Sequence, residues 1–468
     1  MKRKIFSIIP LLLCGILHAE PVTDEYGLMI NAENTISLFP TEKSVAPVKN
    51  ASFGVKRSFV SAASAPTRKW YINHPETRRI CREWHYDGQH IRSAIKIQKS
   101  NKADSNVKTL VRGRRCIDWE NLPKERYGTA AIYQGNDNVL NKVVVIVQPY
   151  IVSLDNATYS DTQFYNDVNQ GLFADSLRDA GYDVILYRYR NTDSGVAFNA
   201  KGVKVLLNRL ENLPSVTSTS VIGLSMGGVV ARYALAELEN ETSLHKMASY
   251  VSFDAPHLGA NLPRNITDNI SRLLSKVDTT LCGLKSNCRS ARTILKSLLS
   301  KINTKTYKEL IINSPNGVTD RQVLLNKLAS LGHVDSIPSL AITSGAQYAT
   351  QGYPNRTLVT HYKLHRKWYN GGSKYFKVYT NPTLDNQSGG YTDFYQLLSN
   401  LVAQQPHPIT PYVTLGQKHS FVSTWSALAG NEGNFTEVAS YPTTNERHLT
   451  ITYNKSVKLR QWLDAHHF

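Results

Sequence analysis

Short apolar runs alternate with amphipathic segments through the middle of the chain. Residues 142–147 are a continuous apolar, mostly β-branched run, which is typical of a strand buried on both faces of a parallel sheet. Further strands are predicted at 182–187, 220–223 and 248–253. Segments with helical spacing fall between the strands, at 164–180, 199–210 and 227–238. Because strands and helices alternate, the pattern predicts right-handed crossovers and a doubly wound, mostly parallel α/β sheet.

The segments on either side of this core have a different character. Residues 20–67 are rich in Ala, Ser, Thr and Pro and have little periodicity, so we expect a poorly ordered lead-in. Residues 68–133 contain short β-prone runs between polar turns, which predicts a small β-rich extension. We therefore assign the α/β domain to 134–468. A Leu-rich and Lys-rich helical insertion at 262–334 has the position of a lid, and 339–343 then resumes the sheet.

Residues 1–19 have the layout of a secretory signal peptide. A basic start is followed by the apolar run Ile5–Leu17, which is too short to span a bilayer comfortably, and by a small residue at Ala19. An uncleaved membrane anchor is the alternative. We expect a protein that is secreted or periplasmic after cleavage of this signal.

Four cysteines remain once the signal peptide, with Cys14, is removed. An even number in an oxidising compartment predicts disulfides, and the favoured pairs are Cys81 with Cys116 and Cys282 with Cys288. Zinc binding is the alternative, but no CxxC pair supports it. Neither a metal nor another cofactor is predicted.

The chain carries a formal net charge of +18. Its Lys and Arg residues are scattered rather than gathered into an arm or stripe, which speaks against a nucleic-acid partner. An anionic membrane surface is a better match for an exported basic protein. The sequence does not address the oligomeric state.

The pentapeptide at 223–227, Gly-Leu-Ser-Met-Gly, matches the pattern G-x-S-x-G. It follows a predicted strand and opens a predicted helix, as a nucleophile elbow does. In such a turn the serine hydroxyl is exposed at the carboxyl edge of the sheet, where α/β active sites form. A serine in an ordinary tight turn is the alternative. We expect Ser225 to be a nucleophile.

Two segments resemble bacterial lipases and the GPI inositol-deacylase-like group. Residues 223–233 (GLSMGGVVARY) resemble their elbow and following helix, and residues 254–261 (DAPHLGAN) resemble the PHxG segment after the next strand. The resemblance covers roughly 143–261 and a stretch around His419. It implies an α/β-hydrolase fold, a lipase or esterase activity, and a supporting rather than catalytic role for His257.

An oxyanion hole needs two N–H donors that face the developing negative charge. The backbone of Met226, directly after the serine, is the expected first donor. The second is expected from the loop after the strand at 142–147, where Pro149 has no N–H. Tyr150 is therefore the first candidate and Gln148 the second. Lipases commonly have His-Gly in this loop, and the chain departs from that pattern.

The catalytic histidine is expected on a loop after the last strand, in the chain order Ser, acid, His. His419 in the stretch His-Ser-Phe-Val follows a polar turn, precedes a predicted short helix and resembles the corresponding stretch of related hydrolases. We therefore expect His419 to be the base. His448, His361 and His365 are rivals, and a solvated loop histidine is the alternative for any one of them.

The acid has two candidates. Its usual place follows the strand at 339–343, but no Asp or Glu occurs from Ser344 until Asp385. Asp254 ends the strand after the elbow, a position from which pancreatic-type lipases supply their acid. Asp385 lies in a Gly-rich loop, and a turn-forming role is the alternative for both residues.

These residues predict hydrolysis of carboxylic esters through an acyl-enzyme on Ser225. A lid-like insertion favours a lipid ester as the substrate, because an amphipathic cover can open on a membrane or droplet. An acyltransferase would use the same acyl-enzyme. A secreted binding protein on a hydrolase scaffold is the alternative from another class.

Overall fold

The computed structural model describes part of the 468 residues. The described residues are 22–23, 28–30, 35–40, 66, 68–72, 78–86, 91–99, 114–117, 127–153, 159–241, 245–262, 265–277, 286–314, 317–348, 358–364, 374–380, 382–392, 409–413 and 419–467. The predicted signal peptide at 1–19, Cys282 and His365 lie outside them. No helix within these ranges is long and apolar enough to cross a membrane.

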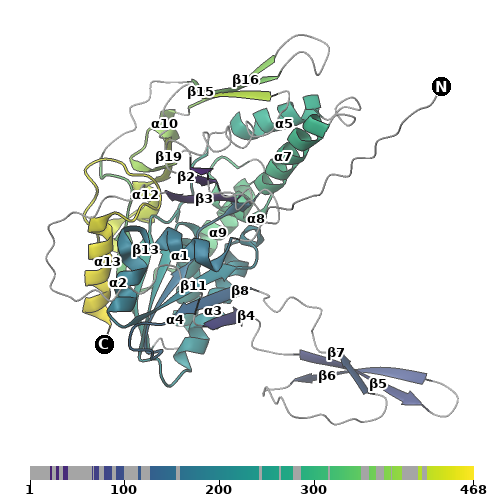
Figure 1. Ribbon diagram of the computed structural model, residues 1–468, viewed down its shortest axis with the longest axis vertical. Helices are drawn as coiled ribbons and strands as arrows, with labels where there is room; N and C mark the ends of the chain where they lie inside the picture. Colours follow the sequence, from purple (N-terminus) through teal and green to yellow (C-terminus); the bar gives the residue numbers. More distant parts are fainter. Residues whose placement is uncertain are drawn as a thin grey trace, which may run out of the picture.

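An eight-stranded sheet forms the centre of the protein (Figure 1). Its strands, in spatial order, are β4 (Arg68–Ile72), β8 (Gly128–Tyr133), β11 (Tyr182–Tyr189), β9 (Lys142–Val147), β12 (Ser218–Leu224), β13 (Met247–Phe253), β14 (Ser339–Ile342) and β20 (Glu437–Val438). Strand β8 is antiparallel to both neighbours, and the other pairings are parallel. This confirms the predicted fold class, an α/β-hydrolase with a mostly parallel sheet.

Strands β4 and β8 belong to the segment at 68–133 that was predicted to be a separate β-rich extension. They pair with each other, and β8 pairs with β11, so both belong to the main sheet, with β4 as its edge strand. The α/β domain therefore starts earlier in the sequence than residue 134.

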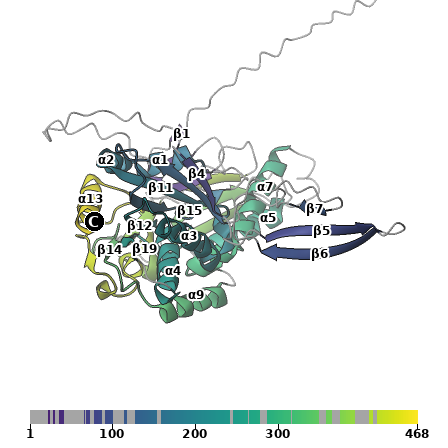
Figure 2. The same ribbon diagram turned by 90° about the horizontal axis from the view of Figure 1, so that it is seen from below.

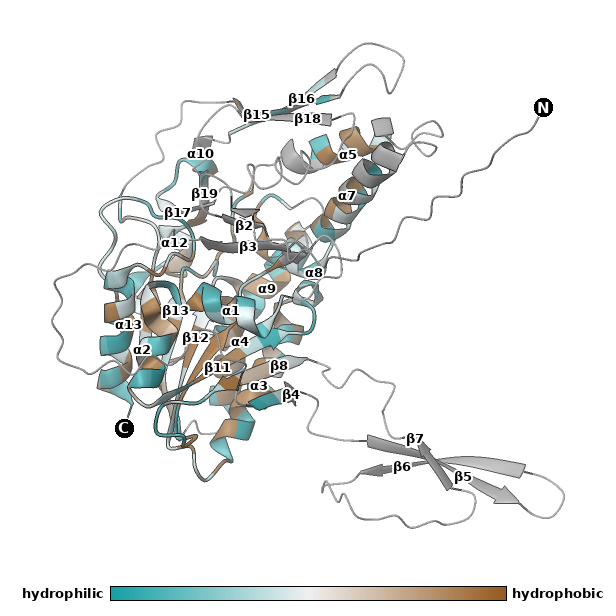
Figure 3. Cartoon of the chain, viewed as in Figure 1, coloured by the Kyte–Doolittle hydropathy of each residue, from teal (hydrophilic) through white to brown (hydrophobic). Residues whose placement is uncertain are grey.

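Helices cover both faces of the sheet because the strand side chains alternate between them. Val144 and Ile146 of β9 face one layer, and Val143 and Val145 face the other. The first layer contains α1 (Asp161–Val168), α2 (Phe173–Asp179) and α13 (Tyr453–His466). The second contains α3 (Val196–Glu211), α4 (Met226–Glu241) and α9 (Val318–Leu331). Figure 2 shows the two layers on opposite sides of the strands, and Figure 3 shows that the strands between them are apolar.

The insertion after β13 lies beyond one end of the sheet, where α5 and α7 run side by side (Figure 1). Its helices are α5 (Asn265–Val277), α7 (Ser286–Ile302) and α8 (Lys305–Leu310), followed by α9. Ile270 and Leu273 of α5 and Leu295 and Leu298 of α7 are buried. These apolar faces are therefore turned toward the body of the protein.

The remaining elements form four smaller sheets and several short helices. The sheets contain β1 (Val22–Thr23), β2 (Leu28–Ile30), β3 (Thr35–Pro40) and β10 (Val152–Ser153); β5 (Arg78–Tyr86), β6 (Ile91–Lys99) and β7 (Arg114–Ile117); β15 (Leu358–Leu364), β16 (Lys374–Tyr379) and β18 (Ile409–Val413); and β17 (Gly389–Thr392) with β19 (His419–Ser423). The short helices are η2 (Gln170–Leu172), η3 (Thr192–Ser194), α10 (Pro382–Asp385), α12 (Thr424–Ala427) and η5 (Glu432–Asn434). The register of β5 and β7 sets Cys81 opposite Cys116, and the disulfide between them stays a prediction.

Candidate active site

Ser225 occupies the turn between β12 and α4. Its φ of 50° lies in the left-handed region, which costs free energy for any residue with a Cβ. The turn is held because the Ser225 N–H donates to the Phe253 carbonyl of β13 at 2.9 Å and the Gly228 N–H donates to the Ser225 carbonyl at 2.8 Å. The serine is thus fixed in the strained conformation of a nucleophile elbow.

The glycines around Ser225 are required by close contacts. A Cβ on Gly223 would lie 2.4 Å from the Cα of Gly228, where strand and helix cross. A Cβ on Gly227 would lie 2.4 Å from the carbonyl oxygen of Val147 at the end of β9. The second contact brings the start of α4 against the loop that follows β9, so the two parts of the predicted oxyanion hole are neighbours.

His448 is the histidine that contacts the serine. Its Nε2 lies 2.8 Å from Ser225 Oγ, and its Nδ1 lies 2.7 Å from Asp254 Oδ2. The carboxylate can only accept, so the geometry assigns the proton to Nδ1 and leaves Nε2 to accept from the serine hydroxyl. All three side chains are buried, and the chain order is Ser, Asp, His.

Asp254 comes directly after β13 and also has a left-handed backbone, with φ of 46°. Its N–H donates to the Ile342 carbonyl at 2.7 Å, and its Oδ1 accepts from the Ser344 N–H at 3.0 Å. The backbone at the end of β14, the usual source of the acid, here orients an acid supplied by the neighbouring strand. Both carboxylate oxygens are engaged, which fixes the carboxylate plane relative to His448.

The segment that carries His448 is bound on two sides. The His448 N–H donates to the Tyr391 carbonyl at 2.7 Å, and the Glu446 N–H donates to the Ser344 carbonyl at 2.7 Å. The Glu446 carboxylate forms an ion pair with Lys455 of α13 at 2.5 Å. These contacts fix the backbone of the segment around His448 and thereby position its imidazole.

Two predicted site residues need correction. His419, the expected base, is buried on β19 opposite Thr392 of β17. His448, a rival in the sequence, lies beside Ser225 instead. Asp385 accepts from Asn261 Nδ2 at 2.6 Å, whereas Asp254 holds the histidine that contacts the serine. Both corrected residues are fixed by local packing in and beside the small β17–β19 sheet.

Two further histidines named from the sequence lie elsewhere. His257 Nε2 lies 2.8 Å from Ser252 Oγ, and burial lowers the pKa of His257 well below its ordinary value, so it is neutral. His361 lies on β15, opposite Lys377 of β16.

The predicted oxyanion donors differ in what their N–H groups do. Met226 is the first residue of α4, so its N–H has no partner within the helix. The Gln148 N–H donates to the Tyr187 carbonyl at 3.1 Å, which removes it from the candidates. Tyr150 lines the same cavity as Ser225 and Met226 and keeps its place as the second candidate.

An apolar pocket opens on Ser225. Its lining consists of Tyr150, Ser225, Met226, Pro256, Ala260, Leu262, Ile270, Leu298, Lys301, Ile302, Thr306, Tyr307, Leu310, Ile311, Thr392 and Phe421. Most of these side chains are apolar, and more than half come from the insertion. Within the described residues, no three His, Cys, Asp or Glu side chains gather as metal ligands would.

Comparisons with known proteins agree with this arrangement. Residues 187–310, which include Ser225 and Asp254, match the family model described as "Putative serine esterase (DUF676)". The chain resembles serine esterases. No curated protein matches it.

Solved structures are only distantly similar to this chain. Est1E from Butyrivibrio proteoclasticus is 12% identical over 27% of this chain and 46% of its own length, with a TM-score of 0.21, so this chain spans less than half of that protein. The esterase EaEST from Exiguobacterium antarcticum is 13% identical, with coverage of 46% and 77% and a TM-score of 0.24. Naproxen esterase from Bacillus subtilis is 10% identical, with coverage of 72% and 88% and a TM-score of 0.30. No functional conclusion follows from scores of this size.

Gly390 provides a first test of the acid's position. A Cβ at this residue would lie 2.3 Å from Asp254 Oδ2, the oxygen that accepts from His448. Gly390→Ala should therefore displace the carboxylate and lower the kcat for ester hydrolysis by about 100-fold. Gly433→Ala is the control, since a Cβ there would meet no atom closer than 3.4 Å. Unchanged kcat in a folded Gly390→Ala variant would contradict the assignment of Asp254.

Proposed function

We propose that the protein hydrolyses carboxylic esters through a covalent acyl-enzyme on Ser225. The observation that carries this proposal is the continuous hydrogen-bonded series from Ser225 Oγ through His448 to Asp254, at 2.8 and 2.7 Å, beside an apolar pocket. A non-catalytic binding protein would have no need for two strained residues whose side chains meet at one histidine.

In the first half-reaction Ser225 Oγ attacks the ester carbonyl carbon while His448 Nε2 removes its proton. The imidazolium that forms is stabilised by the Asp254 carboxylate on Nδ1. The carbonyl oxygen gains negative charge and accepts from the backbone N–H groups of Met226 and Tyr150. Collapse of this tetrahedral species breaks the ester C–O bond, and the alcohol leaves with the proton from His448.

The second half-reaction repeats these roles with water as the nucleophile. His448 Nε2 takes a proton from water as the water oxygen attacks the acyl carbon. The second tetrahedral species breaks its bond to Ser225 Oγ, which recovers the proton from His448. The carboxylic acid is released and the site returns to its starting state.

The pocket supports a lipid ester as the substrate. Its walls beside Ser225 include Leu298 and Ile302 of α7 and Ile270 of α5, which would bury an aliphatic acyl chain. Each methylene that leaves water contributes about 0.8 kcal/mol to binding. We further propose that the N-terminal segment directs secretion and that the positive charge favours anionic membrane surfaces.

Filling the pocket tests the substrate class. Leu298→Trp should remove the space for two or three methylenes, a loss of about 2 kcal/mol, and so lower kcat/KM for p-nitrophenyl decanoate roughly 30-fold. The p-nitrophenyl acetate value should change by less than about threefold, because acetate does not reach the filled region. Ser300→Trp on the exposed side of the same helix is the control. Equal losses on both esters would contradict an acyl-binding role for the pocket.

A further inference from the structure

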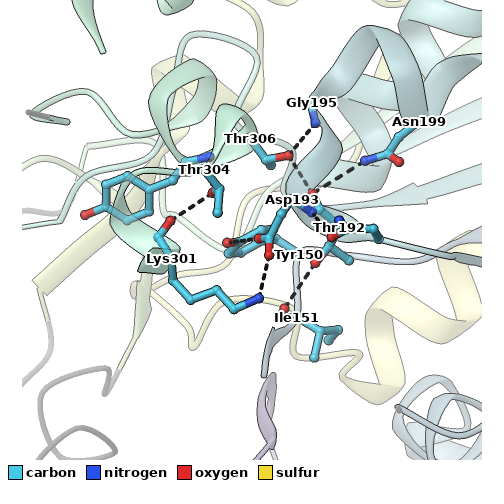
Figure 4. Close-up of polar contacts among 11 residues, drawn as sticks. Tyr150, Ile151, Thr192, Asp193, Gly195, Asn199, Lys301, Thr304 and Thr306 are labelled. Atoms are coloured by element: carbon cyan, nitrogen blue, oxygen red, sulfur yellow. Dashed lines mark hydrogen bonds and ion pairs between the residues drawn. The ribbon is translucent and has the colours of Figure 1, made fainter. Parts of the chain in front are cut away.

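Asp193 joins the insertion to the loop that follows β9. Its Oδ1 accepts from the Tyr150 hydroxyl at 2.7 Å, and its Oδ2 forms an ion pair with Lys301 Nζ at 2.5 Å. Figure 4 shows the carboxylate between the two side chains, which reach it from different segments. Tyr150 and Lys301 both line the pocket that opens on Ser225.

The insertion is docked around Asp193 by a second set of contacts (Figure 4). Thr306 Oγ1 donates to the Thr192 carbonyl and accepts from the Gly195 N–H at 2.8 Å. Glu309 accepts from the Val196 N–H at 2.7 Å, at the first turn of α3. The segment at 192–196 is therefore held by α8, so Asp193 is presented on a fixed backbone.

We propose that Asp193 is a positioning residue that holds Tyr150 in place as an oxyanion-hole donor, and that Lys301 links this position to the docked insertion. This inference rests on the function proposed above. It adds a residue to the reaction that touches neither the substrate nor the triad.

The backbone of the loop explains why the phenol matters. Pro149 fixes its own φ near −65°, so little freedom is left between the end of β9 and Tyr150. The hydrogen bond from the Tyr150 phenol to the Asp193 carboxylate then anchors the side chain of the same residue. This restricts the orientation of the Tyr150 backbone N–H. Burial and the Asp193 carboxylate raise the pKa of Tyr150 well above its ordinary value, so the hydroxyl stays protonated and continues to donate.

Lys301 supplies the charge that a partly buried carboxylate requires. The Asp193 side chain is only 15% exposed and that of Lys301 24%, so their attraction is less screened than in a surface pair. Lys301 lies in the last turn of α7, where its position depends on the insertion being packed against the body. Docking of the insertion against the body and order in the oxyanion loop are thereby coupled.

The test is a double-mutant cycle on p-nitrophenyl butyrate. Tyr150→Phe and Asp193→Ala should each lower kcat about 30-fold with KM changed less than about threefold, since a misplaced donor weakens only the transition state. The double variant should lose no more than either single variant, because both remove the same bond. Asp193→Asn keeps an acceptor for the phenol and should recover most of kcat.

Hydrogen–deuterium exchange at residues 148–151 gives a readout that does not depend on activity. Exchange should be faster in both single variants than in the wild type, and unchanged in the control Tyr182→Phe, whose phenol donates to Asp464 at the same 2.7 Å. A rise in KM alone, additive losses in the cycle, or unchanged exchange at 148–151 would overturn the inference. If the wild type were inactive, the proposed function would fail, and the exchange result would still decide whether Asp193 orders this loop.

Discussion

His448→Ala is expected to lower kcat for ester hydrolysis by about 10⁵-fold, as loss of the general base does in hydrolases of this type. Without the imidazole at 2.8 Å from Oγ, Ser225 has no acceptor for its proton and stays a weak nucleophile. Labelling of the purified protein with a fluorophosphonate probe would measure the nucleophilicity of Ser225 directly. The wild type should label, and Ser225→Ala and His448→Ala should not.

His419→Gln is the informative comparison, because the sequence favoured His419 as the base. It should label at a rate within about tenfold of the wild type once folded, since His448 and not His419 contacts Ser225 Oγ. Thermal unfolding would separate loss of structure from loss of the nucleophile. Normal labelling of His448→Ala, or abolished labelling of a folded His419→Gln, would reverse the assignment of the base.

Asp254→Asn is expected to reduce kcat by about 10⁴-fold with little change in fold. An asparagine at this position can present its amide N–H to Nδ1, which stabilises the tautomer with the proton on Nε2. That tautomer cannot accept from Ser225, and the imidazolium of the transition state loses its counter-charge. The pH dependence of kcat on p-nitrophenyl butyrate would be measured beside the wild type.

Asp385→Asn serves as the matched variant for the acid. The side-chain oxygen of the new asparagine can still accept from Asn261, so we expect kcat to fall by no more than about tenfold. If Asp385→Asn were the more damaged of the two and Asp254→Asn kept most of its activity, the acid would have to be reassigned.

The parallel strands of the core other than β20 could be predicted because each has a local signal. Residues 143–147 are apolar on both faces, and the elbow sequence indicates the order of strand, turn and helix. The pairing of β4 and β8 with this sheet could not be predicted, because long-range pairing leaves no mark in short β-prone runs. Strand β20 has two residues, Glu437 and Val438, which is too short for any periodic pattern.

The candidates for the catalytic acid could be narrowed because its usual position carries no carboxylate. The lack of Asp or Glu from Ser344 until Asp385 indicates that the usual position is empty, and this leaves Asp254 on the adjacent strand and Asp385 as the candidates. The sequence could not indicate that Ser344 would donate its N–H to Asp254, because that bond depends on the register of β13 and β14.

The histidine was misassigned for a related reason. His419 carries the sequence resemblance, but β19 pairs with β17 in a separate two-stranded sheet. His448 follows β20, the true last strand of the main sheet, so the rule that the histidine follows the last strand does hold. Because β20 has only two residues and leaves no pattern in the sequence, the rule could not distinguish His448 from His419.

The triad is distributed unevenly along the chain. Ser225 and Asp254 directly follow two adjacent strands, β12 and β13, whereas His448 follows Asp254 by 194 positions. During synthesis, the ribosome therefore releases the nucleophile and its acid long before the base has been translated. Until the C-terminal segment docks, Ser225 lacks its base, so hydrolytic competence arises only at that last step.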